Sequence, residues 1–476
     1  MRAIGVKRIM LAAPSSGSGK TTITCALLKA LQGRGLKPAS FKCGPDYIDP
    51  LFHGKVLGIK SRNLDTFFAG TEGVQEILAN CQSEYAVIEG VMGLYDGLNV
   101  CGTEGSGYEI AKITQTPIVL VVDAKGIGRT VLSLIKGMLM DDEAHLIKGV
   151  ILNRISEHYY KSLKPVFEKE IGKIRADVQL LGYFPKDENI GIESRHLGLH
   201  LPDEIADLQE KIAQAANLLE KNVDMDALLS IMGHAKCTGC ARKSGAPDES
   251  GQEDQDTGKM PGTGLTLAVA NDDAFCFYYG DNLDQFRKRG VKISYFSPLK
   301  DTSLPKDTCG ILLGGGYPEN HLQELSANTA MLRSIRDAIG RGIPSLAECG
   351  GYMYLHRSVT GMDGNDYEMA GLIDGTCAYT GHLVRFGYLE MQEVNDCFRE
   401  DELYHSLAGM RGHEFHYFDS TVDASACTAA KPGGKSWNSM VMQNNGIWGF
   451  PHFYYASDPA FVDRFIERMR EVAKFR

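Results

Sequence analysis

Short apolar runs alternate with longer amphipathic stretches along most of the chain. The short runs are rich in β-branched residues, which is typical of buried strands. The stretches between them repeat apolar residues three or four positions apart, as amphipathic helices do, for example at 21–32 and 127–139. Strands that alternate with helices predict an α/β protein with parallel sheets. The expected strands are Arg8–Ala13, Pro38–Lys42, Tyr85–Glu89, Pro117–Val122, Lys148–Asn153 and Gln179–Gly182, then Leu265–Ala270, Val291–Phe296, Gly310–Leu313 and Pro344–Ala347.

One segment interrupts this pattern. Residues 233–263 contain no Ile, Leu, Val, Phe, Tyr or Trp, so they cannot bury enough apolar surface to order themselves. We interpret them as a flexible linker between a domain at 1–232 and a domain at 264–476. Cys237 and Cys240 form a CxxC pair inside this segment, with His234 nearby. A single CxxC in a linker is a weak signal for a metal or redox site, and its role stays open.

The stretch before the linker, 202–232, has the pattern of one or two amphipathic helices. Its apolar positions fall on one face, which favours a helix packed on the domain core over a helix that binds a partner. The residues of this face are Ile205, Leu208, Ile212, Ala215 and Leu219.

Composition narrows the class of protein further. The chain has 476 residues, 43% of them hydrophobic and 23% charged, as expected for a soluble globular protein of two or three domains. Its net charge of −10 argues against a nucleic-acid binder or a protein of anionic membranes. No apolar run is long enough to cross a membrane, and we interpret the first apolar run as a strand rather than a signal peptide. The 12 scattered cysteines favour reduced thiols in the cytoplasm.

A glycine-rich loop, Ala13–Thr22, joins the first expected strand to a helix. Glycines there let backbone N–H groups turn onto phosphate oxygens, and the helix N-terminus adds the positive end of its dipole. Lys20 is expected to reach the β- and γ-phosphates, and the Thr21 hydroxyl to ligate Mg²⁺. The loop departs from the usual pattern at its first position, where Pro14 stands in place of glycine. The expected ATP contacts in this loop are Ser16, Gly17, Ser18, Gly19, Lys20, Thr21 and Thr22.

Four carboxylates follow expected strands elsewhere in the first half. Asp46 and Asp49 come just after one strand, while Glu89 ends another and Asp96 lies in the loop beyond it. Ligands of open α/β sheets bind beyond the carboxyl ends of the strands, so these side chains are expected near the glycine-rich loop. Carboxylates placed there can share one Mg²⁺ with Thr21 and the phosphates.

The second half contains a candidate nucleophile. Cys349 lies between an expected strand and an expected helix and is followed by two glycines, a pattern that predicts a sharp elbow with the thiol at the helix N-terminus. Backbone N–H groups of Gly350 and of Gly315, in a glycine run after another strand, are candidates for an oxyanion hole. A nucleophilic thiol also needs a base. Spacing alone leaves three candidates open: His413, His416 and His452.

With both sites described, the chain resembles the cobyrinic acid a,c-diamide synthase family. That family joins a dethiobiotin-synthetase-like ATPase domain to a class I glutamine amidotransferase domain. The resemblance implies two doubly wound α/β domains, the first like P-loop NTPases with a mostly parallel sheet and the second flavodoxin-like. It spans most of the chain and rests on long motifs in a fixed order: APSSGSGKTT, FKCGPDYIDP, IEGVMGLYDG, ESRHLGL, LLGGGYPE, AECGGYMYL and GHEFHYF.

The resemblance also implies an activity. Cysteine attack on L-glutamine releases ammonia, ATP phosphorylates a substrate carboxylate, and ammonia displaces the phosphate. The acceptors are the a and c acetates of cobyrinic acid or a related tetrapyrrole, and a homodimer is a further possibility. The residue roles that the resemblance implies are Lys20, Thr21, Asp46 and Glu89 for nucleotide and Mg²⁺, Asp49 and Asp96 for substrate, Asn153 for adenine, and Cys349 with His452 as nucleophile and base.

The chain departs from the family near its C-terminal end. The family usually reads Tyr-x-His-x-His where this chain reads Phe450-Pro451-His452-Phe453-Tyr454, so Tyr454 replaces the second histidine. A tyrosine hydroxyl can orient an imidazole but is a weaker partner than a carboxylate, which leaves the third member of the triad open.

Alternatives of three kinds remain. Nickel-sirohydrochlorin a,c-diamide synthases share nearly all the motifs, and cobyric acid synthases share the two-domain plan. P-loop positioning ATPases carry a signature lysine five residues before the loop lysine, where this chain has Ser15, and they lack a cysteine elbow.

Overall fold

The computed structural model describes residues 5–187, 190, 194–195, 198–199, 207–236, 260–398 and 400–474. The chain divides into two compact units, Met1–Pro247 and Asp248–Arg476. Most of the predicted linker, with Cys237 and Cys240, lies outside the described residues, as does part of the ESRHLGL motif. The domain limits at 232 and 264 therefore stay predictions.

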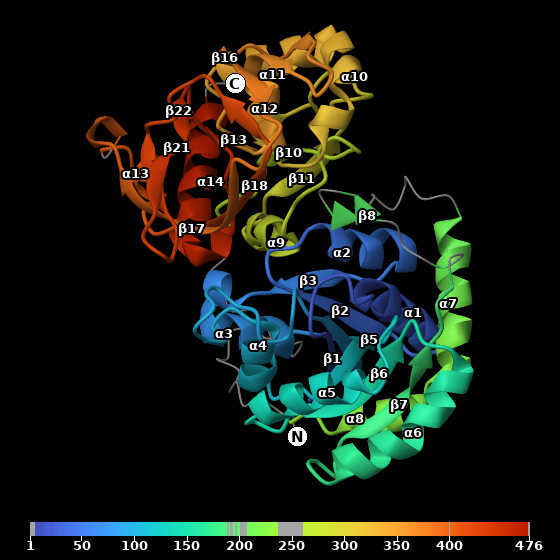
Figure 1. Cartoon of the computed structure of the whole chain (residues 1–476). Coiled ribbons are helices and arrows are strands. Elements are labelled where there is room, and N and C mark those ends of the chain that lie inside the picture. The colour runs from blue at the N-terminus through green and yellow to red at the C-terminus, as the bar shows by residue number, and fades with distance from the viewer. Residues whose placement is uncertain are drawn as a thin grey trace. The chain divides into compact units, whose positions relative to one another are not determined.

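The first unit is built on a seven-stranded parallel sheet (Figure 1). All six strands predicted for this half are present; Tyr85–Glu89 matches at both ends, and the others differ by at most two residues at an end. The strand Ser61–Leu64 was not predicted, because this short edge strand reads Ser-Arg-Asn-Leu and has no apolar run. In sheet order the strands are β3 (Ser61–Leu64), β2 (Pro38–Cys43), β4 (Tyr85–Glu89), β1 (Lys7–Ala12), β5 (Ile118–Asp123), β6 (Ile147–Asn153) and β7 (Gln179–Phe184).

Helices cover both faces of this sheet because its strands are apolar on both sides. Along β1, Ile9 and Leu11 pack into one core while Met10 and Ala12 pack into the other. The first core includes α1 (Lys20–Gly33), α7 (Leu208–Asn222) and α8 (Met225–Gly233). The second includes α3 (Thr66–Ala79), α4 (Gly107–Thr114), α5 (Thr130–Asp141) and α6 (Glu157–Gly172). This doubly wound arrangement confirms the predicted fold class for the first half.

The prediction for 202–232 is confirmed where the structure describes it. Two helices, α7 and α8, occupy most of the segment, and Leu208, Ile212, Ala215 and Leu219 are buried in the core. Ile205 lies outside the described residues.

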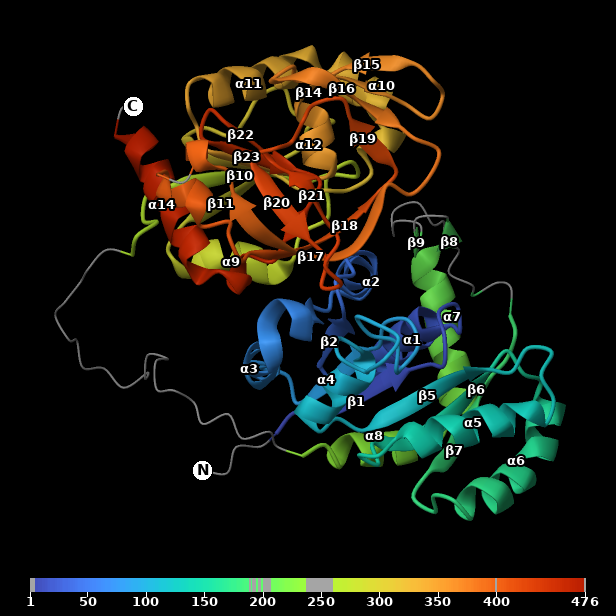
Figure 2. The same cartoon turned by 60° about the vertical axis from the view of Figure 1, so that its left-hand side comes forward.

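The second unit has a central six-stranded sheet (Figure 2). Five of its strands are parallel. When these five are numbered as they occur along the chain, their order across the sheet is 2-1-3-4-5, which is the flavodoxin-like order expected from the resemblance. In sheet order the strands are β11 (Lys292–Phe296), β10 (Thr266–Ala270), β12 (Thr308–Leu313), β13 (Ser345–Glu348), β23 (Gly446–Gly449) and the antiparallel β22 (Val441–Gln443).

Helices cover both faces of this sheet as well. One face packs on α9 (Gly280–Lys288) and α14 (Pro459–Ala473), and the other on α10 (Leu322–Ala327), α11 (Thr329–Gly340) and α12 (Gly350–Leu355). The short helix α13 (Glu402–His405) adds Leu403 and Tyr404 to the first of these cores.

Two further sheets in the second unit were not predicted. Many of their strands alternate buried and exposed residues, so they lack the apolar runs that marked the parallel strands. Their strands are β15 (Asp366–Glu368), β14 (His356–Thr360), β16 (Ile373–Tyr379) and β19 (Phe418–Ser420) in one, and β21 (Ser436–Ser439), β20 (Cys427–Ala430), β17 (Arg385–Val394), β18 (Arg411–His416) and β24 (His452–Phe453) in the other.

Two composition-based expectations can be compared with the described residues. Among these, no helix is both long and apolar enough to span a bilayer. All ten cysteines that the structure describes are free thiols.

Candidate active sites

The glycine-rich loop joins β1 to α1. Gly17 and Gly19 adopt positive φ angles of 73° and 89°, which glycine reaches without strain. A Cβ on Gly19 would lie 2.3 Å from the Asn153 amide nitrogen, so only glycine fits there. Ser18 closes the loop by donating from its hydroxyl to the Ser15 carbonyl at 2.9 Å. The loop therefore has the strand–loop–helix geometry that a phosphate site requires.

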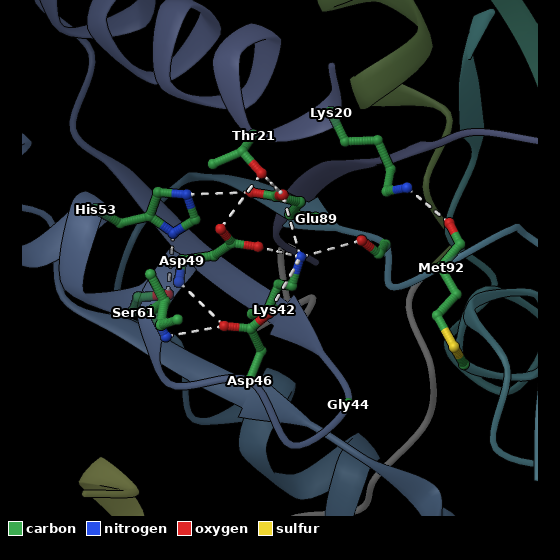
Figure 3. A network of polar contacts seen from close by, with 12 residues as sticks. Lys20, Thr21, Lys42, Gly44, Asp46, Asp49, His53, Ser61, Glu89 and Met92 are labelled. Carbon is green, nitrogen blue, oxygen red and sulfur yellow. Dashed lines mark hydrogen bonds and ion pairs between the residues drawn. The ribbon is translucent and has the colours of Figure 1, made fainter. Parts of the chain in front are cut away.

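Lys20 is the first residue of α1. Its Nζ donates to the Met92 carbonyl oxygen at 2.6 Å (Figure 3). It also donates to the Ser15 carbonyl oxygen at 3.2 Å, so the ammonium group lies over the loop. Burial, together with the nearby Lys42, lowers the pKa of Lys20 to about 8. A nucleotide phosphate near Nζ would offset both effects and keep the group charged.

A compact charged cluster lies beside the loop, and Figure 3 shows its members pointing toward one another. The Thr21 hydroxyl donates to Glu89 Oε1 at 2.7 Å and to Asp49 Oδ1 at 3.3 Å. Lys42 forms an ion pair with Asp49, donates to Glu89 Oε1 at 3.1 Å, and lies 4.0 Å from Asp46 Oδ2. On the far side, His53 Nε2 lies 3.3 Å from Glu89 Oε2. The cluster draws on β2, β4, α1 and the segment after β2.

Charge pairing inside the cluster offsets the cost of burial. Burial alone would raise the pKa of Glu89, but Lys42 and His53 together hold that pKa well below its ordinary value. Burial would likewise lower the pKa of Lys42, yet Asp49 and Glu89 raise it well above normal. Asp49 has the opposite imbalance: burial and the neighbouring carboxylates Asp46 and Glu89 raise its pKa. The cluster therefore has more carboxylate than its one lysine neutralises.

The oxygen atoms of this cluster fit a magnesium ion only when further ligands complete its shell. Among the described residues, no group of three or more His, Cys, Asp or Glu side chains is arranged to hold a metal alone. Mg²⁺ in nucleotide sites commonly takes one or two carboxylates and completes its shell with phosphates and water. Thr21, Asp49 and Glu89 converge in this way, and the carboxylate excess suits a divalent cation.

The other residues predicted for this site lie at its edges. Asp46 lies just before the short helix α2 (Ile48–Leu51), and its Oδ1 accepts from the Ile48 and Asp49 amides, so its Oδ2 is the oxygen that faces Lys42. Asp96 is exposed and accepts from the Gly93 amide at 2.8 Å, in a loop joined to the glycine-rich loop by a hydrogen bond between the Leu94 amide and the Ala13 carbonyl.

Asn153, the expected adenine contact, ends β6 under the loop. Its Nδ2 donates to the Ser18 carbonyl at 2.8 Å, and its Oδ1 accepts from the Arg154 amide at 2.9 Å. Both ends of the amide are thus engaged by the chain, and Asn153 supports the loop in this arrangement.

The predicted cysteine elbow is formed at the end of β13. Cys349 has φ 49° and ψ −103°, a strained backbone for a residue with a side chain, as nucleophile elbows have. Its amide donates to the Gly449 carbonyl at 2.8 Å. A Cβ on Gly351 would lie 2.1 Å from the Leu313 carbonyl, so the helix can start this close to β12 only with glycine. Burial raises the pKa of the Cys349 thiol, while the Gly350 amide opposes this by hydrogen bonding to the sulfur.

His452 lies against the glycine run that follows β12. A Cβ on Gly315 would be 2.3 Å from its Cε1, so the imidazole rests directly on this residue. Burial lowers the pKa of His452 to about 3, with His413 and His416 adding repulsion. His413 pairs with His452 in the β18–β24 register, and His416 stacks on Phe450 at 3.9 Å between ring centroids. The structure thus places His452 beside the predicted oxyanion loop.

A cavity of about 250 Å³ adjoins the elbow through Tyr352, Gly449 and Phe450. Glu414, on β18, is buried there, and among the described residues neither of its carboxylate oxygens has a hydrogen-bond partner. Arg385 Nε lies 3.9 Å and His416 Nε2 3.6 Å from its Oε2. Glu414 is near enough to Cys349 to raise the pKa of its thiol, although less than burial does. The full lining is Tyr352, Arg385, Glu414, Asp419, Ser420, Val422, Asp423, Ala424, Asn438, Ser439, Met440, Gly449 and Phe450.

Sequence reasoning missed several residues of these clusters. Lys42 and His53 are buried among the carboxylates, and Glu348 and Glu414 are buried beside the elbow. A lysine that ends an apolar strand is a usable signal, because a buried ammonium group needs counter-charges. Glu348, directly before the predicted nucleophile Cys349 in another buried strand, carries the same signal.

Comparisons with known proteins agree with both geometries. Residues 9–199 match the profile of the CobQ/CobB/MinD/ParA nucleotide binding domain, and residues 266–452 match the CobB/CobQ-like glutamine amidotransferase domain. A nucleotide-binding domain joined to a glutamine amidotransferase domain defines a glutamine-dependent ligase that uses ATP.

Similar proteins show which family of glutamine-dependent ligases the chain belongs to. A cobyrinate a,c-diamide synthase from Clostridium tetani is 36% identical over 470 residues, covering 97% of this chain and 100% of the relative. Proteins of the same name from Listeria monocytogenes and Salmonella typhimurium are each 37% identical, covering 94% and 97% of this chain and 96% and 98% of their own lengths. The chain belongs to the cobyrinate a,c-diamide synthase family, which confirms the resemblance seen in the sequence.

Proposed function

We propose that this protein amidates the a and c acetate carboxylates of cobyrinic acid, using ATP and ammonia released from L-glutamine. The observation that carries the proposal is the presence, in one chain of this family, of a phosphate loop beside a lysine–carboxylate cluster and of a cysteine elbow beside a buried histidine.

In the first unit, the loop amides and Lys20 are proposed to bind the ATP phosphates. Mg²⁺, held by Thr21 and Glu89 with Asp46 or Asp49, would neutralise phosphate charge and make the γ-phosphate a better electrophile. A carboxylate does not react with ammonia until one oxygen becomes a good leaving group, so phosphorylation must come first. Lys42, fixed between Asp49 and Glu89, is proposed to stabilise charge on the transferred phosphate.

In the second unit, Cys349 is proposed to attack the glutamine amide with His452 as base and the Gly315 and Gly350 amides as oxyanion donors. The cavity beside the elbow is proposed to hold the amino-acid end of glutamine. Its charged side chains match a zwitterion, with Glu414 for the ammonium group and Arg385 for the carboxylate. The volume lies below the roughly 300–1,000 Å³ of pockets for drug-sized ligands, which suits an amino acid.

Mass spectrometry of the product tests the proposal. With cobyrinic acid, glutamine and ATP, we expect two carboxyl groups to become amides, each by replacement of –OH with –NH2. Cys349→Ala should lose glutamine-driven amidation and keep ammonium-driven amidation, whereas Lys20→Ala should lose both. Nickel-sirohydrochlorin, offered in parallel, tests the sister activity; faster amidation of that substrate would reject cobyrinic acid as the acceptor.

A further inference from the structure

The residue directly before the nucleophile lies at the centre of a buried hydrogen-bonded group. Glu348 ends β13, and its Oε1 accepts a hydrogen bond from the Tyr455 hydroxyl at 2.8 Å and from the Phe453 amide at 3.5 Å. Its Oε2 lies 4.0 Å from His452 Nδ1. Carboxylate and imidazole are both buried. A carboxylate facing Nδ1 leaves Nε2 as the basic nitrogen.

The segment that carries His452 is fixed from a second side. Asn282, buried on α9, donates from Nδ2 to the Phe453 carbonyl at 2.7 Å and accepts from the Tyr455 amide at 2.8 Å. These bonds hold the main chain on both sides of Tyr454 and aim the Tyr455 hydroxyl at Glu348. Because Tyr455 occupies Oε1, Oε2 is the oxygen that faces the imidazole.

Tyr454, the residue that the sequence offered as third member, lies in a different environment. Its ring packs against Tyr279 with 5.9 Å between centroids, and its amide donates to the Arg411 carbonyl at 3.0 Å. A phenol ordinarily ionises only near pH 10, whereas Glu348 becomes a carboxylate as pH rises through about 8, its raised pKa.

We propose that Glu348 is the third member of the glutaminase triad, a positioning residue that orients His452 through Nδ1 and stabilises its imidazolium form. The proposal rests on the glutaminase reaction proposed above. His452 Nε2 takes the Cys349 proton as sulfur attacks the amide carbon. It gives that proton to the departing nitrogen as the carbon–nitrogen bond breaks, so that ammonia leaves and a thioester remains. Water then hydrolyses the thioester and regenerates the thiol. Glu348 neither takes up nor gives away a proton during these steps.

Protonation of the resting site sets a measurable signature. Burial raises the pKa of Glu348 to about 8 and lowers that of His452 to about 3, so both are neutral at pH 7. The carboxylate that supports an imidazolium forms as pH rises through about 8. The titratable groups that face the pair are Tyr455, Tyr278, Cys349, His413 and His416. Of these, Tyr278 and Tyr455 have raised pKa values and His413 a pKa of about 4, so none of the three changes charge near pH 8.

The decisive experiment uses Glu348→Gln in the full-length protein. Glutamine hydrolysis should fall in kcat by about 10²- to 10⁴-fold with KM for glutamine within about threefold of wild type, and the rise in rate near pH 8 should disappear. Glu348→Asp should recover part of kcat. Wild-type kcat and pH profile in Glu348→Gln would overturn the proposal, as would the same loss in Tyr454→Phe, the matched control.

A second readout needs neither glutamine nor a macrocycle. The rate at which iodoacetamide alkylates Cys349, followed by peptide mass spectrometry, reports its thiolate fraction. We expect the pH midpoint to move up by about one unit or more in Glu348→Gln, because losing the support of the His452 imidazolium outweighs losing the repulsion between Glu348 and the thiolate. An unmoved midpoint contradicts the proposal. Ammonium-driven amidation should persist in Glu348→Gln. If wild type and variant both lack ammonium-driven amidation, the proposed synthase function is rejected instead. If Glu348→Gln does not fold, Tyr455→Phe serves instead, because it removes the hydroxyl that binds Glu348 Oε1. We expect glutamine hydrolysis to fall roughly tenfold in this variant, and an unchanged rate would contradict the proposal.

Discussion

The two candidate sites bury ionisable groups to a similar degree but leave them in opposite states. In the first unit, Lys42 lies among Asp49 and Glu89, and mutual pairing keeps Glu89 ionised and Lys42 protonated. In the second unit, Glu348 and His452 are buried beside each other, no lysine or arginine among the described residues pairs with Glu348, and burial holds both groups neutral at pH 7.

The difference matches two kinds of chemistry. A site that binds phosphates and a divalent cation needs fixed charges that remain while ligands come and go. A site that moves a proton from a thiol to an imidazole and on to a leaving amine needs groups that change charge easily. Burial is common to both sites, so the choice between the two states depends on whether a permanent counter-charge lies within a few ångströms.

The largest expected effect comes from removing the lysine of the charged cluster. Lys42→Met leaves Asp49 and Glu89 buried without their cation, which we expect to destabilise the first unit by about 3–5 kcal/mol and to abolish amidation from glutamine and from ammonium. Urea unfolding followed by circular dichroism measures the loss.

Two controls make that result specific. Both tryptophans, Trp437 and Trp448, lie in the second unit, so the unfolding transition seen by tryptophan fluorescence should not move. Lys37→Met removes an exposed lysine beside the same strand and should change neither transition. Equal stability of Lys42→Met and Lys37→Met would show that the cluster is not held by charge pairing.

Acid should weaken the second unit because its buried histidines are held neutral. Burial lowers the pKa of His356 to about 4, of His413 to about 4 and of His452 to about 3. The unfolded chain binds protons at these positions below about pH 6.5 while the folded unit does not, so these histidines lower the stability as pH drops from about 6.5 toward 4. Glu348 acts in the opposite direction because of its raised pKa, but one such group offsets only part of the effect of three histidines. We expect the melting temperature from tryptophan fluorescence to fall by roughly 5–10 °C between pH 7 and pH 5. A constant melting temperature over that range would contradict the neutral state of these histidines.

Glu414 tests whether the cavity beside the elbow receives the glutamine ammonium group. Glu414→Gln removes the charge without changing the shape, and KM for glutamine should rise by about 10- to 100-fold. Ammonium-driven amidation should be unchanged. The matched control is Asp423→Asn, an exposed carboxylate on the same cavity wall, for which KM should stay within about threefold of wild type. Equal effects of the two variants would argue against Glu414 as the specific contact.

Proton release offers the smallest but most direct signal from the carboxylate excess. Because burial and neighbouring carboxylates raise the pKa of Asp49, a bound Mg²⁺ should lower that pKa and expel a proton. Calorimetric titration of the protein with ATP and Mg²⁺, in buffers of different ionisation enthalpy, measures this release. We expect a fraction of a proton, up to about one. Asp49→Asn should abolish it. If Asp49→Asn releases as many protons as wild type, the proton comes from a group other than Asp49.

Features carried by consecutive residues were predictable from the sequence. The glycine-rich loop and the cysteine elbow each follow a strand and begin a helix, and positive φ at Gly17 and Gly19, like the close approach of Gly351 to β12, requires glycine itself. Apolar runs marked most of the parallel strands for the same reason, since strands buried on both faces need them; the short parallel strand β23 was not predicted. Ser61–Leu64 and the two smaller sheets of the second unit escaped prediction because short edge strands and half-exposed strands lack such runs.

The sequence by itself determined the two folds, the two loops and the family, because local backbone geometry and burial depend on residue type. Only the tertiary structure decided which distant side chains share a site. Strand order places Lys42 opposite Glu89, 47 residues away, and the turn after β24 brings Tyr455 to Glu348, 107 residues away. Buried charges are stable only with partners, and sequence spacing does not specify which partners the sheets bring together.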